Sequence, residues 1–372
     1  MKIAYCIRPN YLSGGDGIQA TKTKQYIEKL YPDTQINVIT SADELDSSYD
    51  LVHIFNYATV DISESFFRKA MSLELKIVSS PIYWDYSYAK KPLPLCFLFY
   101  KNFISEKYAL FHRRMNLLMA KINVKIPRFS LFDISPYFQN KIRFFIENSD
   151  AILPNSEEEG QLCLEFANVK PVCFDKIKVI YNGVDDETFQ IMSKELFFDT
   201  YQIPQDFLLQ VGRVEYGKNQ LNFLSAMFDY PEIPIVFLGN LNLKSKYARK
   251  IKKIANKRGN VFFVSNIPHE NVYSFYYYAK THVLLSLRES PGLVSLEALS
   301  QGCPIVVSDE RFVPLRTYFS RQFEVANPYS KQSIVSAVFK SMKKEHIPIC
   351  VPDFSWRSIA RNTYLSYEEV IK

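Results

Sequence analysis

The sequence has little of what marks several protein classes. Its six cysteines are scattered without C-x-x-C spacing, which argues against a disulfide framework or a zinc site and favours free thiols in a reducing cytosol. No apolar run approaches the roughly 20 residues that cross a bilayer. The first ten residues resemble a strand rather than a signal peptide. These absences predict a cytoplasmic protein.

Glycine is also scarce, with eleven in 372 residues, so its positions are informative. Gly14, Gly15 and Gly17 follow the first apolar run. Open α/β sheets bind ligands at the carboxyl ends of their strands, where the backbone must approach closely. The glycines therefore predict substrates in a cleft at such ends. Six more lie within or beside the motifs described below: Gly183, Gly212, Gly217, Gly239, Gly292 and Gly302.

The length and the apolar runs predict two domains with parallel sheets. At 372 residues, with 47% hydrophobic and 23% charged residues, the chain is globular and long for one core. Continuous apolar runs alternate with helical stretches in two series, which is typical of two Rossmann-like domains. The linker is expected near Phe189–Gln205. The predicted strands are Lys2–Ile7, Leu51–Phe55, Lys76–Ser79, Ala151–Pro154, Lys178–Ile180, Phe207–Val211, Pro234–Leu238, Val261–Val264, His282–Leu285 and Pro304–Val307.

The stretch Ser286–Asp309 predicts an anion site at a strand-to-helix junction. Ser290 fits an N-cap and Pro291 the first helical position, where its missing N–H costs nothing. The first amides of the helix then point outward without a helical partner. These amides belong to Gly292, Leu293 and Val294.

Two carboxylates flank these amides. Glu289 lies just before them, and Glu297 lies in the second turn of the predicted helix. Amides flanked by two carboxylates suit a ligand that carries both phosphate and hydroxyl groups. A nucleotide sugar is such a ligand.

The Glu289–Glu297 spacing resembles the E-x7-E motif of retaining glycosyltransferases of family 4. GCPIVVSD follows the motif, and further similar stretches occur in the order of that family. They are GGDGIQATKT at Gly14–Thr23, SDAILPNSEEE at Ser149–Glu159, YNGVDDETF at Tyr181–Phe189, VGRVEYGKNQ at Val211–Gln220, FLGN at Phe237–Asn240 and FSWRSIARNTYLSYEEV near the C terminus.

The resemblance implies a GT-B fold, an α/β architecture of two Rossmann-like domains facing across a cleft. Residues 1–190 would form the acceptor-side domain, with a basic aromatic insertion at about 86–144. Residues 191–353 would form the domain that binds the nucleotide sugar. The C-terminal helix, at about 354–372, would cross back and pack on the first domain.

The resemblance also implies roles for the charged residues. Arg213 and Lys218 would hold the donor diphosphate and stabilise the charge it gains on leaving. Glu289 would face the donor sugar as the third catalytic residue, and Glu297 would take the ribose hydroxyls. The alternatives are a solvated surface pair for the two cations, a helix-dipole contact for Glu289 and an exposed helix glutamate for Glu297.

Other residues are assigned to the donor and acceptor by the same resemblance. Asn266 and Ile267 lie in the loop where the family contacts the base, although Ser265 stands where a glycine is common. Gly15 belongs to the glycine-rich loop beside the donor phosphate, before a helix expected to start near Ile18. Asp16 would accept a hydrogen bond from an acceptor hydroxyl, and helix capping is the more ordinary role.

One departure from the family follows the strand at Lys76–Ser79. Many members carry a histidine there, near the reacting sugar, and none of the five histidines of this chain fits. His53, for example, lies within a predicted strand. Ser80, Tyr83 and Asp85 are the candidates for that space.

Two segments concentrate the positive charge. Tyr86–Phe144 has a balance of +9 and mixes apolar with basic residues, so it either meets an anionic membrane surface or packs on the sheet as a helical insertion. Lys244–Arg258 has eight basic residues and no acid. It is expected to be a solvated helix face with the apolar side chains turned inward, namely Tyr247, Ile251 and Ile254.

Together these features predict a retaining glycosyltransferase of hexosyltransferase type that acts in cell-surface polysaccharide biosynthesis. It would move a sugar from a UDP- or GDP-linked donor to a saccharide or polyprenyl-diphosphate-linked acceptor, at the inner face of the membrane. The absence of a D-x-D motif fits a metal-independent enzyme without a cofactor. The alternatives are a nucleotide-sugar epimerase of similar fold and a non-catalytic protein that binds membranes or nucleic acid, although no nucleic-acid module is present.

Overall fold

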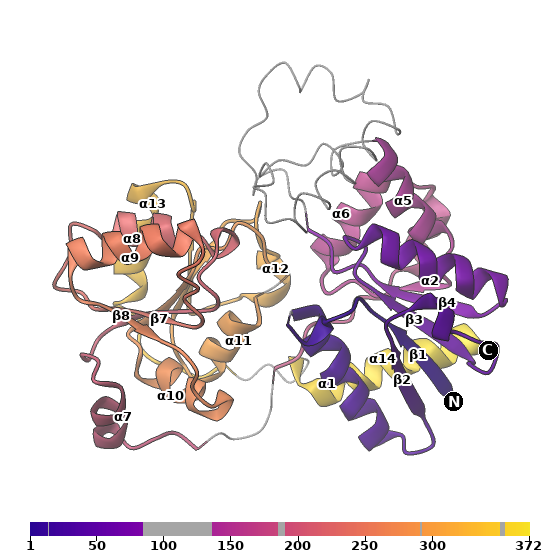
Figure 1. Ribbon diagram of the computed structural model, residues 1–372, viewed down its shortest axis with the longest axis horizontal. Helices are drawn as coiled ribbons and strands as arrows, with labels where there is room; N and C mark the ends of the chain where they lie inside the picture. The colour runs from indigo at the N-terminus through magenta and orange to yellow at the C-terminus, as the bar shows by residue number, and fades with distance from the viewer. Residues whose placement is uncertain (14, 85–135, 185–189, 291, 350–353) are drawn as a thin grey trace. The chain divides into compact units, whose positions relative to one another are not determined.

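The computed structural model describes residues 1–13, 15–84, 136–184, 190–290, 292–349 and 354–372. It divides into two compact units, each with one parallel sheet between helices (Figure 1). Unit 1 comprises Met1–Gly183 and Trp356–Lys372, and unit 2 comprises Val184–Ser355. The sequence prediction puts these two boundaries at residues 190 and 353 instead.

The sheet of unit 1 has five parallel strands in the order β2-β1-β3-β4-β5. Every residue of β3 is buried, as expected for a strand that helices cover on both faces. The strands are β1 (Lys2–Cys6), β2 (Gln35–Ile39), β3 (Leu51–Phe55), β4 (Lys76–Ser80) and β5 (Ala151–Ile152).

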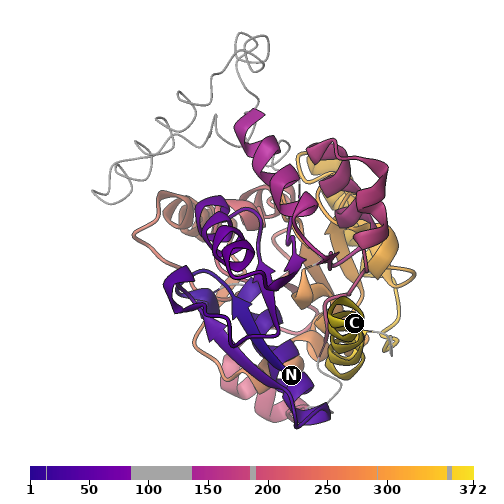
Figure 2. The same ribbon diagram turned by 90° about the vertical axis from the view of Figure 1, so that its right-hand side faces the viewer.

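Helices from distant parts of the sequence cover the two faces of this sheet. One face packs against α2 (Val60–Ser72), α5 (Pro136–Glu147) and α6 (Glu157–Ala167). The other packs against α1 (Gly15–Leu30) and the C-terminal helix α14 (Trp356–Ile371), drawn in yellow in Figure 2. The rings of Tyr31 and Tyr364 stack with centroids 3.7 Å apart. The C-terminal helix therefore belongs to unit 1, as predicted.

The sheet of unit 2 has six parallel strands in the order β11-β10-β9-β6-β7-β8. They are β6 (Leu208–Val211), β7 (Ile235–Leu238), β8 (Val261–Val264), β9 (Thr281–Leu284), β10 (Ile305–Ser308) and β11 (Phe323–Ala326). One face packs against α8 (Gln220–Ala226), α9 (Lys246–Arg258) and α13 (Lys331–Ser341). The other carries α10 (His269–Tyr278) and α11 (Leu293–Ser300) (Figure 1). The short helix α12 (Leu315–Tyr318) precedes β11.

Four further helices lie in connecting segments of the chain. They are η1 (Tyr11–Ser13), η2 (Ala42–Glu44), η5 (Pro171–Lys176) and α7 (Lys194–Tyr201). Helix α7 lies inside the stretch that the sequence prediction assigns to a linker. Its Phe197 ring is fully buried against Phe275, with ring centroids 4.8 Å apart, so this stretch is part of the core of unit 2.

The predicted strands need two kinds of correction. Strands β2 and β11 are missing from the prediction because polar residues interrupt their apolar pattern. The predicted strand at Lys178–Ile180 is wrong, since only the neighbouring Ile177 forms an isolated bridge, with Ile152. The backbone N–H of Lys178 still donates to Ile152 O at 2.9 Å, so the chain follows β5 without forming a strand.

The cysteines of the described ranges are free thiols, as predicted. Cys6, Cys163, Cys173 and Cys303 are buried and form no disulfide. Burial raises the pKa of the Cys6 and Cys303 thiols, which makes them poor nucleophiles. The other two cysteines, Cys96 and Cys350, lie outside the described residues. No helix in the described ranges has the length and apolar character to span a bilayer.

A buried polar cluster joins β3 to the C-terminal helix in unit 1. The Nδ1 atom of His53 lies 2.6 Å from the Tyr367 hydroxyl, and its Nε2 atom lies 2.9 Å from the Ser80 hydroxyl. Tyr5 and Tyr367 share a hydrogen bond of 2.8 Å. Burial lowers the pKa of His53 to about 3, so the ring is neutral near pH 7.

We expect His53 to make unit 1 sensitive to acid. The unfolded chain binds a proton at this ring below about pH 6.5, whereas the folded chain binds none until about pH 3. The free energy of unfolding should therefore fall as the pH drops below 6.5, with a contribution from His53 of up to about 1.4 kcal/mol per pH unit. Urea unfolding between pH 7 and pH 5 measures this slope.

The matched variants are His53→Gln and His269→Gln, since His269 is exposed in α10. The slope should flatten in the first variant and stay unchanged in the second. Equal slopes in all three proteins would contradict the account.

Candidate active site

Two neighbouring strands of unit 2 bring three of the predicted catalytic residues to one edge of the sheet. β6 and β9 pair in parallel, with Leu208 beside Thr281 and Leu209 beside His282. Their carboxyl ends therefore lie next to each other. The loop after β6 carries Arg213 and Lys218, the second of these in η6 (Tyr216–Lys218), and the loop after β9 carries Glu289.

An ion pair joins these two loops. Lys218 Nζ contacts Glu289 Oε1, and the Ser286 hydroxyl donates a hydrogen bond of 2.6 Å to the same oxygen. The backbone N–H of Leu287 donates to Gly217 O at 2.8 Å. The lysine and glutamate side chains are 24% and 11% exposed, so the pair is largely shielded from water. The loops are thus fastened through both side chains and backbone.

Arg213 lies at the same edge but is open to solvent. Its side chain is 61% exposed, and its nearest acidic partner is Glu215 at 3.5 Å. The backbone around it is fixed by two buried glutamines. Gln220 Nε2 donates to Arg213 O at 2.9 Å, and Gln210 Nε2 donates to Lys218 O at 2.7 Å. The arrangement presents a guanidinium on a rigid loop.

Two glycines allow these loops to pass closely. Gly212 has φ +134° and Gly239 has φ +146°, which disfavours a side chain at either position. A Cβ atom at Gly239 would lie 2.3 Å from Gly212 O. The FLGN and VGR motifs therefore depend on glycine for the contact between the loops after β6 and β7.

Helix α11 starts later than predicted. Gly292, with φ +88°, is the N-cap and Leu293 is the first helical residue, so the prediction of Ser290 as N-cap is wrong. Pro291 lies outside the described residues. The physical reason is the positive φ, which Gly292 tolerates and which ends the preceding loop directly before the helix. Leu293 and Val294 lie in the first turn, where a helix supplies no acceptor for their amides.

Glu297 is held by a residue that the sequence analysis does not identify. The hydroxyl of Tyr276, in α10, donates a hydrogen bond of 2.8 Å to Glu297 Oε2. Burial, and then the Glu297 carboxylate, raise the pKa of Tyr276 well above its ordinary value, so it remains a donor. No sequence signal separates Tyr276 from its neighbours Tyr277 and Tyr278.

Asn266 and Ile267 lie in the loop between β8 and α10, at the carboxyl edge of the same sheet. Asn266 is exposed and has φ +57°, which asparagine tolerates better than most residues. Ile267 is half-buried. The loop thus shares the sheet edge with Arg213 and Glu289.

The carboxyl edge of the sheet in unit 1 carries a separate polar cluster. Asp16 forms a two-pronged ion pair with Arg8, at 2.7 and 2.8 Å, and accepts a bond of 3.2 Å from Asn56. Burial alone would raise the pKa of Asp16, but the bonds from Arg8 and Asn56 outweigh it and lower the pKa. Gly15 is the first residue of α1, so this helix begins three residues before Ile18, where it was expected.

Of the other two acceptor-side candidates, the structure describes Tyr83. Tyr83 is buried, and its ring packs against Phe166 with centroids 5.6 Å apart. Its backbone N–H donates a hydrogen bond of 2.7 Å to the fully buried carboxylate of Glu159. The same carboxylate accepts a hydrogen bond of 2.9 Å from the backbone N–H of Asn155. Tyr83 is therefore a packing residue here. Asp85 lies outside the described residues.

Comparisons with known proteins identify a family model, related sequences and similar folds. Residues 193–348 match the family model "Glycosyl transferases group 1". We call this stretch the group 1 domain. It contains the ion pair Lys218–Glu289, together with Arg213 and Glu297.

Two curated relatives share part of the sequence. An uncharacterized glycosyltransferase of Methanocaldococcus jannaschii is 29% identical over 36% of this chain and 36% of its own length. The serotype-specific mannosyltransferase WbdA of Escherichia coli is 22% identical over 60% of this chain and 29% of its own length. The chain thus spans less than two thirds of either relative.

Solved structures resemble the whole chain. The Anabaena protein HepE in complex with UDP aligns with a TM-score of 0.63 and 14% identity, over 100% of this chain and 96% of that one. At this identity the likeness concerns the fold. The fold is GT-B, an α/β architecture with two Rossmann-like halves, as the sequence resemblance implies.

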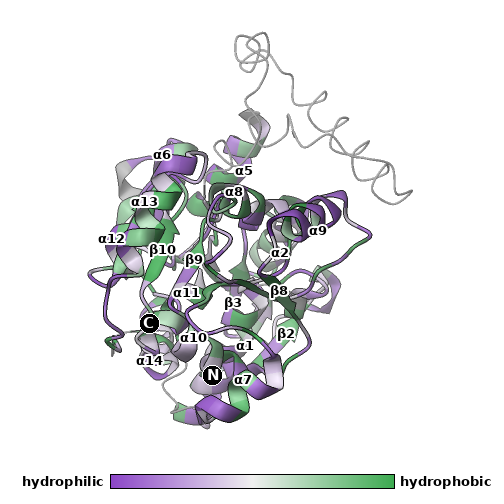
Figure 3. Cartoon of the chain, turned by 90° about the vertical axis from the view of Figure 1, so that its left-hand side faces the viewer, coloured by the Kyte–Doolittle hydropathy of each residue, from purple (hydrophilic) through white to green (hydrophobic). Residues whose placement is uncertain are grey.

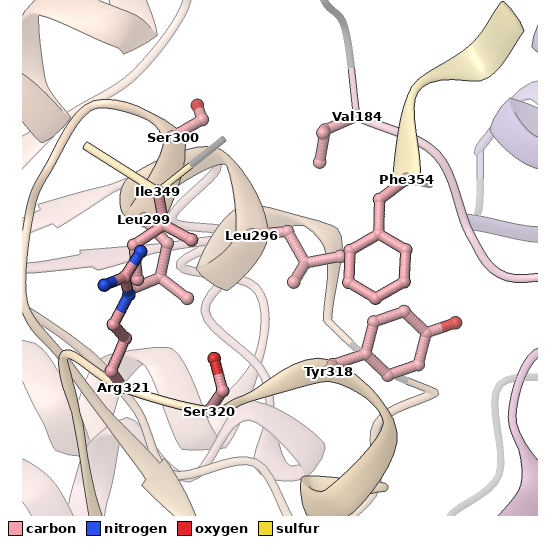
Figure 4. Close-up of a pocket in the computed structure, with 9 residues that line it drawn as sticks. All are labelled: Val184, Leu296, Leu299, Ser300, Tyr318, Ser320, Arg321, Ile349 and Phe354. Atoms are coloured by element: carbon pink, nitrogen blue, oxygen red, sulfur yellow. The ribbon is translucent and has the colours of Figure 1, made fainter. Parts of the chain in front are cut away.

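A cavity in unit 2 is lined in part by residues of helix α11. Its volume of about 30 Å³ suits a water molecule, whereas small-molecule sites usually enclose roughly 300–1,000 Å³. In Figure 4, Leu296 points toward the ring of Phe354, beside Tyr318. This cavity is too small for a nucleotide sugar, so the candidate site remains the loop edge of the group 1 domain.

We expect the group 1 domain to require glycine at residue 239. Gly239→Ala should lower the free energy of unfolding by about 1–3 kcal/mol, because the new methyl group meets Gly212 O and the backbone conformation is strained. Chemical denaturation of the full chain measures the loss. The control is Gly217→Ala, since a Cβ atom there meets nothing within 4 Å. An equal effect of the two substitutions would contradict the close loop contact.

Proposed function

We propose that the chain is a retaining, metal-independent glycosyltransferase that moves a sugar from a nucleoside diphosphate donor to a hydroxyl acceptor. The observation that carries the proposal is the pairing of Lys218 with Glu289 beside the first turn of α11, with Arg213 exposed on the adjoining loop. Two cations and a helix amino end suit a diphosphate. A carboxylate beside them suits sugar hydroxyls.

The chemistry assigns each group a separate task. The acceptor oxygen bonds to the anomeric carbon while the bond from that carbon to the diphosphate breaks. The acceptor proton passes to an oxygen of the leaving diphosphate, so attack occurs on the face that the leaving group vacates. Arg213, Lys218 and the amides of Gly292, Leu293 and Val294 stabilise the charge on the diphosphate. Glu289 orients the donor sugar.

Donor binding would also exchange ion-pair partners. In the structure, the charge of Lys218 is balanced by Glu289. The diphosphate is negatively charged like Glu289 and can pair with Lys218 in its place. Glu289 is then free to bind the donor sugar. The exposed guanidinium of Arg213 supplies a fork for the phosphate oxygens without breaking a close contact.

We also propose contacts with the other parts of the donor. Glu297, oriented by Tyr276, would hold the ribose hydroxyls. Asn266 and Ile267 would lie against the base, and Gly15 beside the donor phosphate. The structure of HepE holds UDP, which supports a nucleoside diphosphate as ligand of this fold.

The acceptor is proposed to be a saccharide or a polyprenyl-diphosphate-linked saccharide in cell-surface polysaccharide biosynthesis. The mannosyltransferase WbdA is described as serotype-specific, which supports a surface polysaccharide. Asp16 is the acceptor-side candidate, although Arg8 and Asn56 already occupy its carboxylate. The proposed peripheral contact with the inner face of the membrane is assigned to 86–144, most of which lies outside the described residues.

The test is a panel of UDP- and GDP-sugars with a chelator present, followed by NMR. The proposal expects free nucleoside diphosphate and a product that keeps the anomeric configuration of the donor. If a new nucleotide sugar forms without net release of nucleoside diphosphate, the enzyme is an epimerase and the proposal is wrong. Salt-sensitive membrane or nucleic-acid binding without any turnover would replace it with a non-catalytic protein. A strict requirement for divalent metal would contradict metal independence.

We expect Arg213→Ala to slow release of nucleoside diphosphate from the active donor by about a hundredfold, the usual effect of removing one transition-state donor. Steady-state kinetics of donor turnover measure the change. Arg361→Ala is the control, because Arg361 is an exposed arginine of α14 in unit 1. Normal turnover by Arg213→Ala would show that Arg213 does not stabilise the leaving diphosphate.

We expect Tyr276→Phe to weaken nucleotide affinity about fivefold, because Glu297 loses the hydrogen bond that orients it. Glu297→Ala should weaken it further. Tyr277→Phe is the matched control, since Tyr277 is the next residue in the chain and is half exposed. Fluorescence titration with a labelled nucleotide measures all four proteins. Unchanged affinity in Glu297→Ala would show that the ribose assignment is wrong.

A further inference from the structure

Helix α9 has two faces of opposite character. Ala248, Ile251 and Ala255 are buried against the sheet of unit 2. Lys246, Lys250, Lys253 and Lys257 are exposed and follow one another at spacings of four, three and four. At 3.6 residues per turn these lysines form one stripe about 16 Å long, opposite the buried face. The helix is mostly purple in Figure 3.

The C-terminal end of α9 is fixed in the core and is not part of the stripe. The guanidinium of Arg258 is buried and donates to the carbonyl oxygens of Met227 and Ile233 at 2.8 and 2.7 Å. Residues of α9 also pack in the core of unit 2. The lysine stripe is therefore held on a helix that cannot rotate.

The stripe is electrostatically unfavourable for the folded helix itself. Like charges at spacings of three and four repel, and the first turn of α9 contains no acidic residue to match the helix dipole. Lys250, Lys253 and Lys257 have no ion pair within the described ranges. The run from Lys244 to Arg258 has eight positive charges, more than the net charge of +6 of the whole chain. Surfaces that serve only solubility usually carry positively and negatively charged side chains in a mixture.

We propose that the lysine stripe of α9 docks unit 2 on an anionic lipid surface. Four to eight basic residues on an amphipathic helix are typical of surfaces that bind anionic headgroups. Lysine is a hydrated point charge on a flexible stem, which suits a diffuse layer of headgroups, whereas nucleic-acid sites favour arginine forks and exposed aromatic rings. No exposed residue of α9 is aromatic. The inference goes beyond the proposed activity, and its test needs no turnover.

The test is cosedimentation of the full chain with phosphatidylcholine vesicles, with and without phosphatidylglycerol. Wild type should bind only the vesicles that contain phosphatidylglycerol, and less as salt rises. The triple variant Lys250→Glu, Lys253→Glu and Lys257→Glu should bind them about tenfold or more weakly. Replacement of the same lysines by glutamine should give a smaller loss in the same direction, and circular dichroism checks that both variants fold.

The matched control changes three exposed lysines in and just after α13 in the same unit, as Lys331→Glu, Lys340→Glu and Lys343→Glu. The change in net charge is identical, so vesicle binding should stay near that of wild type. Equal losses in the two triple variants, or no loss in the α9 variants, would overturn the proposal. Tighter binding of wild type to single-stranded RNA than to vesicles, abolished by the α9 changes, would also overturn it. Nucleotide affinity should stay unchanged throughout, which separates this test from that of the transferase.

Discussion

The candidate site depends on the parallel pairing of β6 with β9. This pairing sets the exits of two strands side by side although more than sixty residues separate them in the sequence. The loop with Arg213 and Lys218 then meets the loop with Glu289, and the ion pair and backbone bond fasten them. Gly239 has no room for a side chain at the closest passage, whereas Gly212 is favoured by its positive φ. The position of each charged group follows from the sheet.

The charged groups at this edge differ in how they are held. Lys218 and Glu289 satisfy each other in a half-buried setting, while Arg213 projects into water. Breaking a shielded pair is costly unless a ligand supplies a new partner. Glu297, in the same unit, is likewise oriented by a neighbour, Tyr276. Such supporting contacts hold a polar site in one geometry before a substrate arrives.

Much of this could be predicted from the sequence, because strands buried on both faces and short motifs leave strong local signals. The motifs point to Arg213, Lys218 and Glu289, whose loops meet at one edge of the sheet, and to a C-terminal helix that packs on unit 1. The start of α11 was misplaced because Ser290 and Pro291 fit a helix start, whereas a positive φ at Gly292 decides it. Tyr276, Arg8 and Glu159 were missed because tertiary contacts alone distinguish them from other residues of their type.

The most direct test of the account is calorimetric titration of the full chain with UDP and with GDP in the presence of a chelator. The account holds that the loops after β6 and β9, with the first turn of α11, form a diphosphate site that needs no metal. It predicts that one of the two nucleotides binds tightly under these conditions. Binding of neither nucleotide, or binding that appears only when divalent metal is restored, would contradict it.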